Sequence, residues 1–126
     1  LLPYLKRIIE PIREAGLKVA MHSCGAIGRV IPRLIDAGVE ILAALQAQAA
    51  GMDAVSLSQY KKDLIFMGGV DTQRLLPFGT AREVYDEVLR LRGLFGEGFI
   101  VSPSHEALLP NVPYENVVAM AEAAKA

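Results

Sequence analysis

The chain is poor in cysteine, in aromatic residues and in any excess of charge. Its single cysteine, Cys24, excludes an internal disulfide bond. The amino terminus lacks the basic segment followed by an apolar segment that is typical of a secretory signal peptide. We therefore expect a reducing, cytoplasmic setting.

Long apolar runs and basic clusters are missing as well. The longest uncharged stretch, residues 41–52, includes two glutamines and is well short of the roughly 18 residues that a membrane-spanning helix needs. Thirteen basic residues stand against 14 acidic ones without forming a basic run, and the aromatic residues are four Tyr and four Phe. These features argue against a membrane-spanning or nucleic-acid-binding protein, and we expect a small-molecule substrate.

Apolar residues are abundant instead. They make up 52% of the chain, whose 126 residues are enough for one core and too few for two, so we expect a single domain over residues 1–126. The excess predicts apolar surface that this segment alone does not bury. Because the chain opens on Leu1-Leu2-Pro3, without an initiator methionine and inside an amphipathic pattern, we expect it to be part of a longer protein.

Apolar periodicity and turn residues predict helices and strands in alternation. The capping-box spacing of Thr80 and Glu83 predicts the start of one of these helices. Four strand–helix units imply a parallel sheet with right-handed crossovers, which is either half of a (β/α)8 barrel or a small open sheet. The predicted helices are residues 2–15, 27–37, 53–60, 80–93 and a last segment from Pro113, and the predicted strands are residues 17–22, 39–45, 64–67 and 98–102.

Both histidines and the cysteine lie at or just past the ends of predicted strands, where parallel α/β folds gather their chemistry. His22 and Cys24 are two residues apart, so in an extended strand they project to the same side. With His105 as the third ligand and a fourth position open, they predict a catalytic zinc site. Such a site lowers the pKa of a bound thiol and presents the nucleophilic thiolate. The alternative is that Cys24 is a small buried apolar residue and both histidines are hydrogen-bonded loop residues.

Three further residues are candidates for binding a substrate or cofactor. Gly68 and Gly69 either let the backbone approach a ligand or form a tight turn after their strand. Asp71 either orients a ligand histidine or caps the following turn, and we favour the cap. Glu106 is either a proton-transfer group or a solvated charge at the rim, and we favour the rim. Gln46 is interpreted as loop scaffolding.

A series of short motifs runs along nearly the whole chain. They are His22-Ser-Cys-Gly25, Leu34-Ile-Asp-Ala-Gly38, Ala50-Gly-Met-Asp53, Gly68-Gly-Val-Asp-Thr-Gln73, Leu76-Pro-Phe-Gly-Thr80, Ser102-Pro-Ser-His105 and Pro113-Tyr-Glu-Asn-Val117. In this order they resemble the carboxy-terminal part of the uroporphyrinogen decarboxylase superfamily, which also contains cobalamin-dependent, zinc-containing methyltransferases. The resemblance implies an α/β fold in which this chain is the carboxy-terminal half of a (β/α)8 TIM-type barrel, with about four parallel strands.

The resemblance also bears on the reaction. In the methyltransferase branch a His-x-Cys motif and a cysteine after the last strand bind zinc, which implies that His22 and Cys24 are ligands and that His105 stands at the third position. True decarboxylases have a histidine followed by glycine in that last loop, whereas Glu106 follows here, and their catalytic aspartate and arginines have no counterpart in this chain.

We therefore favour a zinc- and corrinoid-dependent methyltransferase that methylates a thiol. The alternatives are a uroporphyrinogen decarboxylase, a lyase of tetrapyrrole biosynthesis, and a catalytically silent fragment of this fold. The expected partners are the missing amino-terminal half or a second copy of the chain, and a corrinoid protein as methyl donor. Alone, the chain is expected to lack the complete reaction.

Overall fold

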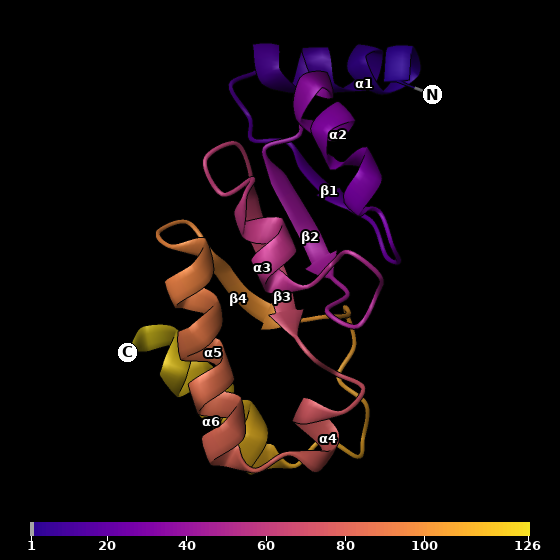
Figure 1. The fold of residues 1–126 in the computed structure, drawn as a ribbon. Coiled ribbons are helices and arrows are strands. Elements are labelled where there is room, and N and C mark those ends of the chain that lie inside the picture. Colours follow the sequence, from indigo (N-terminus) through magenta and orange to yellow (C-terminus); the bar gives the residue numbers. More distant parts are fainter. Residues whose placement is uncertain (1) are drawn as a thin grey trace.

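The structure is a computed structural model that describes residues 2–126, except for the side chain of residue 44. Helices and strands alternate along the chain, and helix α1 lies at one end of the molecule beside α2 (Figure 1). The elements are α1 (Leu2–Glu14), β1 (Ala20–His22), the 3-10 turn η1 (Gly28–Val30), α2 (Ile31–Ala37), β2 (Ile41–Leu45), α3 (Ala54–Ser58), β3 (Ile65–Val70), α4 (Leu75–Phe78), α5 (Ala81–Phe95), β4 (Ile100–Pro103) and α6 (Tyr114–Lys125).

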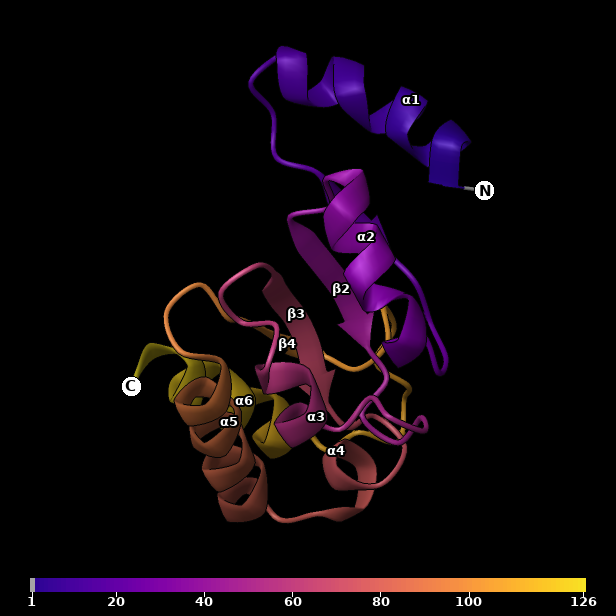
Figure 2. The same ribbon diagram turned by 45° about the horizontal axis from the view of Figure 1, so that its top comes forward.

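The four strands form one parallel sheet in the order β1-β2-β3-β4. Each strand pairs with the next one along the chain and the order never reverses, so right-handed crossovers place the connecting helices on one face. Helices α2, α3 and α5 accordingly lie over the same face of the sheet (Figure 2). This arrangement confirms the predicted α/β fold, half of a TIM-type barrel.

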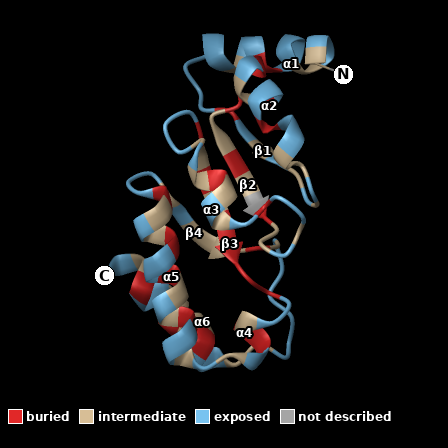
Figure 3. Cartoon of the chain, viewed as in Figure 1, coloured by how far each residue is buried: buried red, intermediate tan, exposed pale blue. Residues whose placement is uncertain are grey.

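The two faces of the sheet are covered differently. Leu42 and Phe66 lie opposite each other on β2 and β3, and both are fully buried on the side of the helices, where the ring of Phe66 packs 4.8 Å from that of Phe95 in α5. The next row, with His22, Ala43, Met67 and Ile100 in register, points to the other face. Its residues are half-buried or exposed, and within residues 2–126 no helix covers this face (Figure 3).

Helix α5 shows why local sequence signals succeed in this chain. The hydroxyl of Thr80 accepts a hydrogen bond from the backbone N–H of Glu83, and the Glu83 carboxylate accepts one from the backbone N–H of Thr80, which confirms the predicted capping box. One face of the helix is buried against the sheet and includes Val84, Val88 and Leu91.

All four strands differ from their predicted bounds. Strand β1 begins at Ala20, three residues later than predicted, and β2 and β4 each begin two residues later than predicted, at Ile41 and Ile100. Strand β3 continues to Val70, so Gly68 and Gly69 lie inside the strand and do not form a turn after it. Their φ angles of 120° and 89° are ones that L side chains rarely adopt, and the pairing of β2 with β3 shifts register at this point.

Apolar surface remains exposed, as the composition predicts. Tyr4 and Ile8 of α1 are 68% and 65% exposed, and Phe78 of the short helix α4 is 78% exposed. Among residues 2–126, no helix combines the length and the apolar character needed to cross a membrane.

Candidate metal centre

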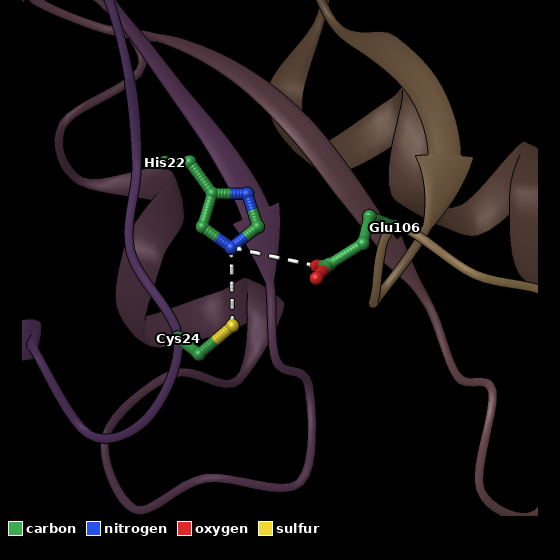
Figure 4. Close-up of side chains that lie close together, drawn as sticks. All are labelled: His22, Cys24 and Glu106. Atoms are coloured by element: carbon green, nitrogen blue, oxygen red, sulfur yellow. Dashed lines mark hydrogen bonds and ion pairs between the residues drawn. The ribbon is translucent and has the colours of Figure 1, made fainter.

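His22 and Cys24 lie close together at the carboxyl end of β1. His22 is the last residue of the strand, on the face of the sheet that carries no helix, and Cys24 is in the loop that follows. His22 Nε2 lies 3.2 Å from Cys24 Sγ, and both residues are exposed (Figure 4). The structure therefore brings these two predicted ligands together.

The loop that carries Cys24 is held by the neighbouring strand. The backbone N–H of Gly25 donates a hydrogen bond to the side-chain oxygen of Gln46, which directly follows β2, at 2.9 Å. This contact agrees with the interpretation of Gln46 as scaffolding. It fixes the residue next to Cys24 and so limits how far the thiol can move from His22.

The third side chain in this cluster is Glu106. Its Oε2 lies 3.5 Å from His22 Nε2, and the candidate ligand atoms of His22, Cys24 and Glu106 all lie within 4.8 Å of one another (Figure 4). His105, predicted as the third ligand, is half-buried and does not belong to the cluster. The structure thus groups Glu106, and not its neighbour His105, with His22 and Cys24.

The cluster combines side chains from the two edge strands of the sheet, because His22 is in β1 and Glu106 follows β4. Strands β1 and β4 are separated by β2 and β3, which in a flat sheet would put them about 14 Å apart. Glu106 reaches His22 because the loop after β4 crosses the carboxyl ends of the central strands. The loop after β4 therefore brings the third side chain of the cluster to the end of β1.

A buried serine anchors the loop after β4. Ser104 is 1% exposed, its backbone N–H donates to the carbonyl of Val70 at 2.7 Å, and its hydroxyl accepts a hydrogen bond from the backbone N–H of Thr72 at 3.1 Å. The hydroxyl of Thr72 also lies 3.1 Å from that of Ser104. These contacts fix the chain two residues before Glu106. Ser104 lies in the motif Ser102-Pro-Ser-His105, but its anchoring role was not predicted from the sequence.

Asp71 caps the turn that follows it. Its carboxylate accepts hydrogen bonds from the backbone N–H groups of Gln73, Arg74 and Leu75, at 3.0, 3.2 and 3.3 Å. The side-chain amide of Gln48 donates a further bond at 3.3 Å. This geometry agrees with the favoured interpretation of Asp71 as a cap, because it orders the entry into α4.

The candidate binding residues Gly69 and Asp71 face a different part of the molecule. Both line a cavity of about 590 Å³ between α3, α4 and α5, which shares no residue with the His22 cluster. A binding role for Gly68, Gly69 and Asp71 stays a prediction, and in the structure the backbone angles of the glycines and the capping bonds of Asp71 already account for these residues.

The donor atoms of His22 and Cys24 suit zinc. Imidazole nitrogen and thiolate sulfur are both common zinc ligands, and in a tetrahedral site with ordinary bond lengths they lie about 3.5 Å apart. The observed separation is 3.2 Å. A small adjustment of either side chain would therefore place one ion between them.

The strand order, the helices on one face and the cluster at the carboxyl ends of the strands define a protein of the TIM-barrel class, with its candidate chemistry in the loops after the strands. The family described as Uroporphyrinogen decarboxylase (URO-D) matches residues 1–126, and the chain belongs to this family. No match was found among curated proteins.

Proposed function

We propose that this chain is the zinc-binding part of a thiol methyltransferase within the uroporphyrinogen decarboxylase family, with a methylated corrinoid as the methyl donor. The observation that carries the proposal is the His22–Cys24 pair, with Nε2 and Sγ 3.2 Å apart at the carboxyl end of β1. A nitrogen and a sulfur ligand from one short segment form the beginning of a zinc site, and a decarboxylase needs no such pair.

The residues of the chain have distinct tasks in this proposal. His22 and Cys24 hold the metal, and Gln46 keeps the loop of Cys24 in place through Gly25. Zinc bound there would lower the pKa of a substrate thiol and favour the nucleophilic thiolate. The side chain of His22 is 48% exposed, so a thiol can approach the pair from solvent.

Uroporphyrinogen decarboxylation, the activity in the description of the matched family, is the second candidate. The two candidates differ in their need for metal. Removal of zinc abolishes thiol activation and leaves a metal-free decarboxylase unaffected. A catalytically silent fragment would show neither property.

Thiol binding by the purified chain tests the proposal. With zinc present, calorimetric titration with coenzyme M, a small thiol of the kind that the zinc-containing methyltransferases of this superfamily methylate, should show binding with the release of about one proton per thiol, because the thiol binds as thiolate. A chelator and the Cys24→Ser variant should each abolish the binding. Ser23→Ala is the matched control, because Ser23 lies between the two ligands in sequence but lines a groove with Met21.

The opposite pattern would favour the decarboxylase. Turnover of uroporphyrinogen that is lost in His105→Ala, and that continues after zinc is removed, would overturn the methyltransferase proposal.

A further inference from the structure

We propose that the carboxylate of Glu106 is the third protein ligand of the metal and that the adjacent imidazole of His105 is not a ligand. The inference rests on the proposed function in one respect: it takes the pair of His22 and Cys24 as a metal site. It then assigns the remaining protein ligand, for which the sequence alone had favoured His105.

Geometry favours Glu106. In a tetrahedral zinc site, nitrogen and oxygen ligands at ordinary bond lengths lie about 3.3–3.4 Å apart. Glu106 Oε2 lies 3.5 Å from His22 Nε2, and the Cys24 sulfur belongs to the same group of ligand atoms within 4.8 Å. His105 is not in that group, although it is the next residue in the chain.

The anchoring of the loop explains why one residue and not its neighbour reaches the cluster. Ser104 is buried and bonded to Thr72 and Val70, so the chain direction is set immediately before His105. His105 is half-buried beside this anchor, whereas the side chain of Glu106 is 73% exposed and extends toward the loop after β1 (Figure 4).

Charge balance also favours a carboxylate. A dication held by neutral His22, the Cys24 thiolate and the Glu106 carboxylate forms a site with a formal charge of zero, whereas His105 in place of Glu106 would leave a charge of +1. A neutral site adds less positive charge around a bound thiolate and so leaves that thiolate more electron-rich. The two ligand sets therefore differ in chemistry as well as in geometry.

Cobalt(II) is the probe for this assignment, because a thiolate ligand gives it a sulfur-to-metal charge-transfer band and a tetrahedral site gives it intense visible bands. We expect the wild-type chain to bind about one Co²⁺ with both signals. Glu106→Gln should weaken binding at least tenfold, since the ligand charge is lost while the shape of the side chain is kept. His105→Ala should change affinity less than twofold. Far-ultraviolet circular dichroism of each variant checks that the fold is retained.

The outcomes separate this inference from the proposed function. If His105→Ala weakens Co²⁺ binding and Glu106→Gln does not, Glu106 is not the ligand, while the metal site of His22 and Cys24 remains. If the wild-type chain gives no sulfur-to-cobalt band, both the inference and the zinc chemistry are wrong.

Discussion

Ser104→Ala tests whether the loop after β4 is anchored where the metal centre requires it. The side chain of Ser104 is 1% exposed, and its hydroxyl accepts the hydrogen bond of the Thr72 backbone N–H at 3.1 Å. Alanine removes this acceptor and leaves a donor in the interior without a partner. An unsatisfied buried polar group costs about 1–3 kcal/mol, so we expect the free energy of unfolding to fall by about that amount.

Urea unfolding followed by circular dichroism measures the effect. The midpoint should fall while the slope with denaturant stays unchanged, because the surface exposed on unfolding is nearly the same. Ser58→Ala is the matched control: its hydroxyl donates to the carbonyl of Val55 within one exposed helical turn, and its loss should change stability by no more than about 0.5 kcal/mol.

Ser104→Ala should also weaken metal binding, because Ser104 fixes the chain two residues before Glu106. Equal unfolding free energies for Ser104→Ala and Ser58→Ala would refute the account of the anchor. A destabilised Ser104→Ala variant with wild-type Co²⁺ affinity would show that the anchor stabilises the fold without positioning the ligand.

Three further predictions concern the fold and its assembly. Gly69→Ala should reduce the unfolding free energy by about 1–2 kcal/mol, because φ is 89° there, a backbone conformation that L side chains rarely adopt. Gly93→Ala, in the last turn of α5 where nothing lies within 4 Å of the added Cβ, should raise it by up to about 1 kcal/mol, and equal effects of the two variants in urea unfolding would contradict the backbone argument. Hydrogen bonds from the backbone N–H and then the hydroxyl of Thr80 hold the pKa of the Glu83 carboxyl below its usual value. The ionised carboxyl of Glu83 therefore stabilises the fold at pH values above the pKa that it has in the unfolded chain. This stabilisation is lost as the pH falls through the lower pKa that it has in the folded chain. The difference in unfolding free energy between wild type and Glu83→Gln should become smaller as the pH is lowered from about 6 to about 3. A difference that stays constant over this range would contradict the argument. Finally, the open sheet edges and the sheet face without a helix predict that the chain self-associates or binds the complementary half of a barrel. A monodisperse monomer in sedimentation at low micromolar concentration would argue against this.

Sequence signals that act over a few residues predicted the fold well. The capping box of Thr80 and Glu83 and the buried stripe of α5 both lie within one helix, where spacing alone decides which residues meet. The four-residue helix α4 was not predicted, because Leu75–Phe78 is too short to show a helical period. The extent of β3 was also missed, since Gly68 and Gly69 usually end a strand and here occupy positive φ angles inside one.

The candidate site also has one part that the sequence predicts and one part that it does not. His22 and Cys24 are two residues apart, and the structure brings them together as the spacing predicts, although β1 ends at His22 and Cys24 lies in the loop that follows, so strand alternation is not the reason. The third residue depends on contacts between distant segments: the bonds of Ser104 to the loop after β3 set the direction of the chain that brings Glu106 to β1. No spacing in the sequence encodes that path, so His105 and Glu106 could not be distinguished before the structure was known.

Zinc content measured by mass spectrometry on the wild-type chain and the Cys24→Ser variant, purified side by side, tests the proposed metal centre most directly. A single site predicts about one zinc per wild-type chain. Loss of the thiolate, the softest ligand in the cluster, predicts a much lower content in Cys24→Ser. Equal zinc in both proteins would remove Cys24 from the site, and with it the basis for thiol activation.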